Sequence, residues 1–148
     1  MNGPAQWNEW RPVINCVLLA VRHQGLTEGV RGLLETTFDA VVMVADETSL
    51  FESAERLKPS VTIVDLSLAR GEGLQWLLRL RSRCPGLKVI VLSVHDEPSV
   101  FRSAMKAGAD AFVLKRAIAT DLLAAIDAVR AGQTYVSAGT SGGPSAKE

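Results

Sequence analysis

Short apolar runs alternate with amphipathic segments along most of this chain. The apolar runs occupy about residues 15–20, 41–45, 61–65, 88–92 and 111–114. Each run is followed by a segment in which apolar residues recur every three to four positions, at about residues 25–35, 49–57, 71–83, 96–108 and 120–132. Because the runs are apolar at successive positions, they predict strands that are buried on both faces. Strand–helix units in series predict a single-domain α/β fold, with a parallel sheet, right-handed crossovers and helices on both sides.

Several residues mark the expected helix boundaries. Ser49 followed three positions later by Glu52 has the capping-box spacing, which predicts that the second helix begins there. Pro98 suits the first turn of the fourth helix, where a missing backbone N–H costs nothing. Gly132 favours the end of the last helix, which is expected to begin at Thr120.

Polar side chains follow three of the predicted strands. Asp65 ends the third apolar run, Ser93 follows the fourth and Lys115 follows the fifth. The carboxyl ends of parallel strands lie at one edge of a sheet, where ligands collect, so a carboxylate, a hydroxyl and an ammonium group are expected together. Position alone leaves two interpretations of Asp65 open. It is either a functional residue of this edge or a helix cap, since an aspartate after a strand commonly caps the next helix.

Composition and charge narrow the class of protein. The 148 residues, 47% of them hydrophobic, are enough for one core, which we expect at residues 13–137 between an extension (1–12) and a Gly/Ser-rich tail (138–148). Sixteen basic residues balance sixteen acidic ones, so no global field favours contact with nucleic acid or a membrane. No apolar run is long enough to cross a bilayer and no signal peptide is apparent, so we expect a cytoplasmic location.

Other residues that could carry chemistry give weaker signals. Cys16 and Cys84 lie outside any metal-binding spacing and are expected to be small buried residues. His23 and His95 fall near the same edge as Asp65, but they lack partners at diagnostic spacing, so no metal site is predicted from them. The aromatic residues of the extension, Trp7 and Trp10, either anchor a partner or pack on the domain itself.

Three motifs in order then make a resemblance specific. They are Val-Thr-Ile-Val-Asp-Leu-Ser at 61–67, Val-Ile-Val-Leu-Ser at 89–93, and Ala-Gly-Ala-Asp-Ala-Phe-Val-Leu-Lys at 107–115. With these motifs the chain resembles a response regulator receiver domain of the NarL/FixJ type. The resemblance implies a (βα)5 flavodoxin-like three-layer sandwich whose five-stranded parallel sheet has the order 2-1-3-4-5.

The resemblance also implies roles for individual residues. Asp65 matches the aspartate that accepts a phosphoryl group from a histidine kinase, and Lys115 would supply a cation to the phosphoryl oxygens. Ser93 would bond a phosphoryl oxygen and draw its loop inward. Phe112 matches the switch aromatic that moves with that loop, although it also fits a half-buried strand aromatic.

One departure from the family pattern affects the metal. The family carries two adjacent acidic residues after the first strand, which bind Mg²⁺ together with the phosphoacceptor, and this chain has Val21 and Arg22 there. The usual site has three carboxylates and one lysine, with a formal charge of −2, whereas Asp65, Arg22 and Lys115 sum to +1. This charge disfavours a dication, so we expect Mg²⁺ binding to be weak or absent. Two arrangements are open: Arg22 pairs with Asp65, or it points to solvent while Asp65 pairs with Lys115 alone. Two origins are also open: Arg22 is a substitute for the metal, or it reflects drift in a decayed site.

The sequence therefore predicts a receiver domain that is not an enzyme and belongs to a transcriptional regulator. A histidine kinase is its expected partner, and a homodimer is expected through the helix 4/strand 5/helix 5 face or the helix 1/helix 5 face. One alternative is a stand-alone pseudo-receiver that signals without phosphorylation. Another is a small-ligand binder or enzyme on the same fold, which the absence of a Gly-rich phosphate loop after the first strand disfavours.

Overall fold

The computed structural model describes residues 15–22, 24–68 and 74–137, with the side chains of 24–27 excepted. The elements, in chain order, are β1 (Cys16–Ala20), α2 (Gln24–Leu34), β2 (Ala40–Val44), α3 (Glu47–Leu57), β3 (Val61–Asp65), the 3-10 turn η2 (Leu66–Leu68), α4 (Gln75–Arg83), β4 (Val89–Ser93), α5 (Pro98–Lys106), β5 (Ala111–Leu114), the 3-10 turn η3 (Lys115–Ala117), α6 (Ile118–Arg130) and β6 (Tyr135–Val136).

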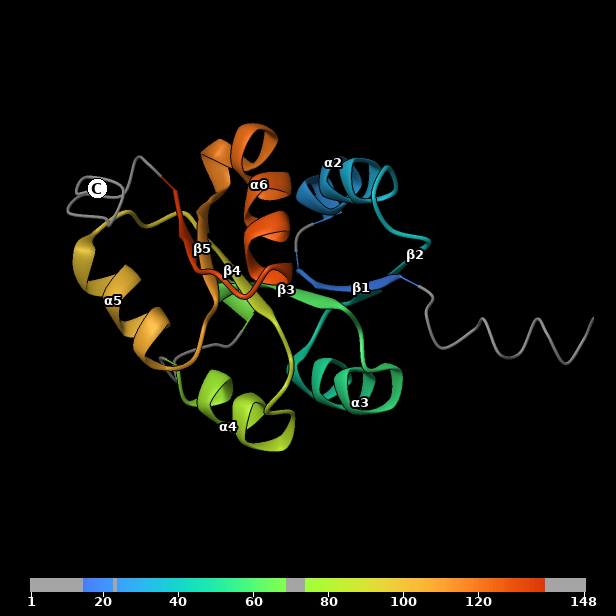
Figure 1. Ribbon diagram of the computed structural model, residues 1–148, viewed down its shortest axis with the longest axis horizontal. Coiled ribbons are helices and arrows are strands. Elements are labelled where there is room, and N and C mark those ends of the chain that lie inside the picture. Colours follow the sequence, from blue (N-terminus) through green and yellow to red (C-terminus); the bar gives the residue numbers. More distant parts are fainter. Residues whose placement is uncertain (1–14, 23, 69–73, 138–148) are drawn as a thin grey trace, which may run out of the picture.

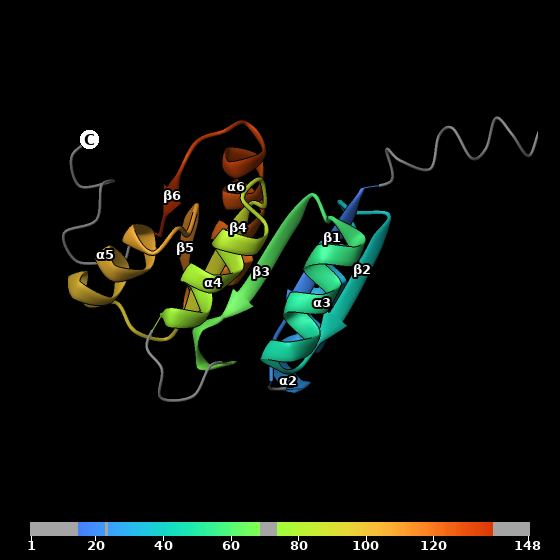
Figure 2. The ribbon, with the colours of Figure 1, turned by 90° about the horizontal axis from the view of Figure 1, so that it is seen from below.

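All strands pair in parallel in one sheet of order β2-β1-β3-β4-β5-β6. Helices α2 and α6 cover one face, while α3, α4 and α5 cover the other, so the molecule has three layers (Figures 1 and 2). The strands most central in the sheet, β3 and β4, are buried along their whole length. The predicted α/β flavodoxin-like sandwich and its order for the first five strands are confirmed.

Alternate residues of each strand supply the two halves of the core. On β1, Leu18 and Ala20 face the side of α3, α4 and α5, and Val17 and Leu19 face α2 and α6. This alternation is the ordinary geometry of a strand, whose successive side chains point to opposite faces. It explains why the strands are apolar at successive positions.

The prediction of five strands was incomplete, because a sixth strand, β6, pairs with the outer edge of β5. Tyr135 N donates to Asp110 O and Ser137 N donates to Phe112 O. The Ser137 hydroxyl, whose residue is fully buried, accepts from Leu114 N at 3.0 Å. Two residues are too few to give a sequence period, and this strand exists only because β5 offers a free edge to pair with.

Two predicted helix starts were wrong. Helix α3 begins at Glu47, because Asp46 is the N-cap and its carboxylate accepts from Ser49 N at 2.7 Å. That bond holds the pKa of Asp46 below its usual value. Helix α6 begins at Ile118, directly after η3. The predicted start of the third helix, at Gly71, lies outside the described residues, and α4 is described from Gln75.

A partly buried polar cluster fastens the connection between α5 and β5. Arg81 pairs with Asp110 at 2.8 Å and donates to the Leu87 carbonyl, and Asp110 Oδ2 also accepts from Val89 N. Gly108 has a φ of +117°, and a Cβ added there would lie 2.5 Å from Arg81 Cγ. The connection therefore needs glycine both for its backbone conformation and for room.

Within the described residues, no helix is both long enough and apolar enough to cross a membrane. Trp7, Trp10 and the tail at 138–148 lie outside the described residues.

Candidate functional site

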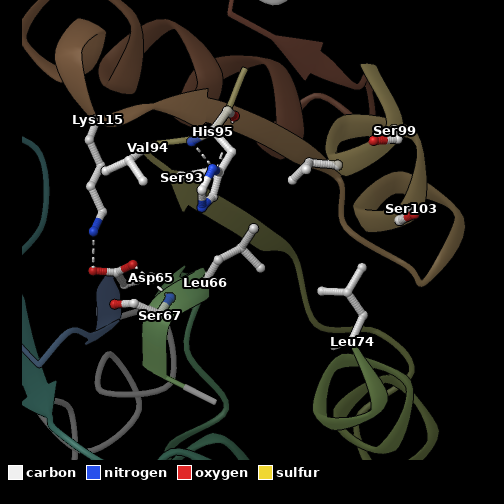
Figure 3. Close-up of a pocket in the computed structure, with 11 residues that line it drawn as sticks. Asp65, Leu66, Ser67, Leu74, Ser93, Val94, His95, Ser99, Ser103 and Lys115 are labelled. Atoms are coloured by element: carbon white, nitrogen blue, oxygen red, sulfur yellow. Dashed lines mark hydrogen bonds and ion pairs between the residues drawn. The ribbon is translucent and has the colours of Figure 1, made fainter. Parts of the chain in front are cut away.

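The carboxyl ends of β3, β4 and β5 bring Asp65, Ser93 and Lys115 to one edge of the sheet (Figure 3). Asp65 is opposite Leu92 in the strand register, and Ser93 is opposite Leu114, the residue before Lys115. The three side chains line the same hollow in the surface. The structure thus places together the residues that the sequence predicted as one site.

Asp65 is almost fully buried, with 1% of its side chain exposed, and it meets two donors. Lys115 Nζ lies 2.6 Å from Oδ2 and forms an ion pair with it. Oδ1 accepts from the backbone N–H of Ser67 at 2.9 Å. No hydrogen bond reaches Oδ2 within the described residues, so the Lys115 ammonium alone compensates that buried oxygen.

Ser93 lies at this edge, but its hydroxyl is engaged by its own loop. It accepts from His95 N at 2.8 Å and lies 3.1 Å from His95 O, to which it donates. The residue is 1% exposed. The β4–α5 loop is thus fastened to its own strand, and Ser93 would have to exchange these bonds in order to reach a group on Asp65.

The residues after β1 match the alternative in which Asp65 pairs with Lys115 and not with Arg22, except that Arg22 also reaches a backbone carbonyl. Val21 is buried and 5% exposed, whereas Arg22 is exposed. Arg22 Nη1 donates to the Ser67 carbonyl at 3.4 Å, and no ion pair joins its guanidinium to Asp65. Asp65 and Arg22 therefore hold the same residue, Ser67, from its N–H and its C=O respectively.

Phe112 on β5 is fully buried, so the interpretation as a half-buried strand aromatic is wrong. Its ring meets that of Phe101 on α5 edge to face, with centroids 6.0 Å apart. Its backbone carbonyl accepts from Ser137 N beside β6. The aromatic in the switch position thus lies inward, against the helix that follows the Ser93 loop.

A hollow of about 430 Å³ opens beside the Asp65–Lys115 pair, between η2, the β4 loop and the first turns of α5. Leu66, Leu74 and Val100 supply apolar wall. Ser67, Ser99 and Ser103 supply hydroxyls (Figure 3). Sequence reasoning did not select Ser99 and Ser103. Their spacing of four places both on one face of α5, a signal that becomes useful only once the facing elements are known.

No group of three or more His, Cys, Asp or Glu side chains within the described residues can hold a metal ion. His23 lies outside the described residues, and His95 Nδ1 is 3.8 Å from Glu97 Oε1. Cys16 and Cys84 are free and only partly buried, so the expectation that they are buried was wrong. Desolvation raises the pKa of both thiols, and the Glu55 charge adds to this at Cys84.

Comparisons with known proteins agree with this geometry. Residues 17–127 match the response regulator receiver domain family. The chain is 33% identical over 116 residues to the transcriptional regulatory protein DegU of Brevibacillus brevis, covering 77% of this chain and 49% of that protein. It is 31% identical over 123 residues to the nitrate/nitrite response regulator protein NarL of Escherichia coli K12, covering 82% and 57%.

A solved structure of two RcsB dimers bound to two parallel DNAs superposes with a TM-score of 0.76 at 26% identity, covering 86% of this chain and 66% of that one. The chain spans about half the length of the curated relatives it matches. The family match covers most of the chain, and the paired Asp65 and Lys115 lie where the motifs require. The chain belongs to the response regulator receiver domain family and is a receiver of the NarL type.

Proposed function

We propose that this receiver domain is the regulatory part of a transcriptional regulator, and that it signals through protein contacts with little use of metal-dependent phosphorylation at Asp65. The names of DegU and NarL support the first half of the proposal. The single observation that carries the second half is the environment of Asp65, where Oδ1 accepts from Ser67 N–H, Oδ2 is ion-paired with Lys115, and the neighbouring tip of β1 offers no carboxylate.

The residues present do not fit Mg²⁺. This ion prefers six oxygen ligands in octahedral array, with one or two carboxylates from the protein. Asp65 is the carboxylate at hand, and Mg²⁺ would have to displace Lys115 from Oδ2 or Ser67 N–H from Oδ1. Val21 has no oxygen in its side chain, and Arg22 places a cation on Ser67 instead.

Charge argues in the same direction. Three carboxylates and one lysine sum to −2, whereas Asp65, Lys115 and Arg22 sum to +1, a change of three units. One unit charge about 4 Å from another is worth about 4 kcal/mol at an effective dielectric near 20, and twice that against a dication. Even after screening of the exposed Arg22, a loss of several kcal/mol in metal affinity is expected.

Phosphorylation of Asp65 would be slow for a related reason. A carboxylate oxygen must attack phosphorus while the leaving group departs, and the charge that develops on the phosphoryl oxygens needs nearby cations. Lys115 can supply one cation, but it would first have to exchange its bond with Asp65 Oδ2. Without a dication to offset this, the attacking oxygen stays paired.

Protein partners follow from the same proposal. We expect a histidine kinase to bind near this edge, and a second copy to bind through α5/β5/α6 or through α2/α6. RcsB, a relative with a solved structure, is described as dimers bound to DNA. In the α5/β5/α6 arrangement, the partner would meet β6 along the β5 edge, because Tyr135–Val136 covers that edge.

Phosphorylation by a small phosphodonor tests the proposal. The protein is incubated with acetyl phosphate and Mg²⁺, and the phosphoryl adduct is followed by intact mass spectrometry. We expect slow labelling of the wild type and labelling at least about 100-fold faster in the Val21→Asp/Arg22→Asp variant, a gain equal to about 2.7 kcal/mol. Circular dichroism checks that the variant folds.

Arg31→Asp is a control for the Arg22→Asp half of the double variant, because Arg31 is also exposed and the charge change at the two arginines is equal. It should label as slowly as the wild type. Rapid, Mg²⁺-dependent labelling of wild-type Asp65 would contradict the proposal.

A further inference from the structure

The site at Asp65 keeps its hydrogen-bond donors although it lacks the carboxylates that a metal needs. Lys115 Nζ has one partner among the described residues, the Asp65 carboxylate with which it is ion-paired, so N–H donors remain for a further acceptor. Arg22 uses a single N–H, toward Ser67 O. Ser67 lines the same hollow as Lys115, and its hydroxyl forms no hydrogen bond with a described residue.

These donors surround a single carboxylate. Lys115 contacts Asp65 directly, and Arg22 is joined to it through one residue, Ser67. Two fixed cations and one anion leave a local formal charge of +1. Such a site attracts an oxyanion instead of a dication, and guanidinium and ammonium groups are the side chains that bind phosphate and carboxylate oxygens best.

The adjoining hollow suits the rest of a ligand. Its volume of about 430 Å³ is within the range of small-molecule pockets, and it opens directly beside Lys115. Ser99 and Ser103 line its wall, and neither hydroxyl bonds to a described residue. Leu66, Leu74 and Val100 provide apolar surface for an organic group.

We propose that this hollow binds, without a metal and without a covalent bond, a small organic molecule that carries a phosphate or carboxylate group. The oxyanion contacts Lys115 and the Ser67 hydroxyl inside the hollow, Arg22 reaches it from its position on the Ser67 carbonyl just outside the lining, and the organic body lies against α5. The inference rests on the proposed function, since Mg²⁺ bound to Asp65 would occupy the place of the oxyanion. Occupancy would draw Lys115 away from Asp65 and so change the edge that includes the β4–α5 loop.

Titration in EDTA tests this inference separately from phosphorylation. Inorganic phosphate and phenyl phosphate are added to the ¹⁵N-labelled chain, with phenol as a neutral control, and backbone resonances are followed. We expect saturable shifts at Ser67, Ser93 and Lys115 with both anions and none with phenol. Phenyl phosphate should bind at least about tenfold more tightly than phosphate, a difference of about 1.4 kcal/mol. Acetate and benzoate then show whether a carboxylate replaces phosphate.

Three variants assign the contacts. Arg22→Gln should weaken the binding of phosphate and of phenyl phosphate at least tenfold. The control Arg31→Gln should leave both affinities unchanged. Ser103→Leu fills the hollow from the exposed face of α5. The affinity for phenyl phosphate should therefore fall to that for phosphate, while the affinity for phosphate itself stays unchanged. All three positions are exposed, so the variants are expected to fold.

Absence of saturable shifts in EDTA, equal binding by Arg22→Gln and Arg31→Gln, or binding that appears only with Mg²⁺ would overturn the inference. Ser103→Leu without effect on phenyl phosphate would overturn the placement of the organic body. Weak phosphorylation combined with no anion binding would leave the proposed function standing and this inference refuted.

Discussion

The ion pair between Asp65 and Lys115 predicts a stability loss that depends on which partner is removed. Asp65 is 1% exposed and Lys115 is 16% exposed, with 2.6 Å between Nζ and Oδ2. Replacing Lys115 by methionine keeps most of the side-chain volume but leaves a carboxylate oxygen buried with no compensating charge. Breaking a buried pair in this way costs about 3–5 kcal/mol.

We expect a loss near the lower end of that range, about 3 kcal/mol, for Lys115→Met. Lys115 retains some contact with solvent, and Ser67 N–H still donates to Oδ1 of Asp65 in the variant. The double variant Asp65→Asn/Lys115→Met removes both charges and should lose only about 1 kcal/mol, because no charge is then left unpaired. The double variant should therefore be about 2 kcal/mol more stable than Lys115→Met.

Urea unfolding followed by far-UV circular dichroism measures these differences, with the slope of the transition compared between variants. Lys106→Met is the control, since Lys106 is an exposed lysine at the end of α5 and its replacement should change the free energy of unfolding by less than about 0.5 kcal/mol. If Lys115→Met were as stable as Lys106→Met, or if the double variant were the least stable, the reasoning would be refuted.

Two further predictions concern parts of the fold that support the site. Ser137→Ala removes the buried acceptor of Leu114 N. We expect the free energy of unfolding in urea to fall by about 1–2 kcal/mol, and hydrogen exchange at Leu114 N to become faster. Unchanged exchange there would show that this bond does not hold β5. Gly108→Ala should lower the free energy of unfolding by about 2 kcal/mol or more, because φ is +117° and the new Cβ meets Arg81 Cγ. Gly29→Ala, in open space within α2, should raise it by about 0.5–1 kcal/mol. Equal effects at the two glycines would contradict the geometry.

Much of the fold could be predicted because it depends on local patterns. Continuous apolar runs alternating with helical periods indicate strands covered on both faces, and the run that ends at Asp65 places its carboxylate at the sheet edge. The same logic placed Ser93 and Lys115 beside it. Helix starts were predicted less well, since Asp46 competes with Ser49 for the N-cap of α3 and only the backbone geometry decides between them.

The predictions that failed or stayed open depended on contacts between distant segments. Strand β6 has no period of its own and forms because β5 leaves an edge to pair with. Exposure of the cysteines depends on which neighbours cover them. The orientation of Arg22 was open from the sequence, and the Ser67 carbonyl, 45 positions further along the chain, is what its guanidinium meets.

The sequence by itself determined which chemical groups reach the edge of the sheet, because strand polarity and residue order fix what lies at the end of each strand. It also determined that the acidic pair after β1 is absent, with Val21 and Arg22 in its place. Only the tertiary structure decided how these groups pair, with Lys115 on Asp65, Arg22 on Ser67 and the Ser93 hydroxyl on its own loop. Pairing depends on distances of a few ångströms between side chains from different strands and loops, and no periodicity in a sequence encodes such distances.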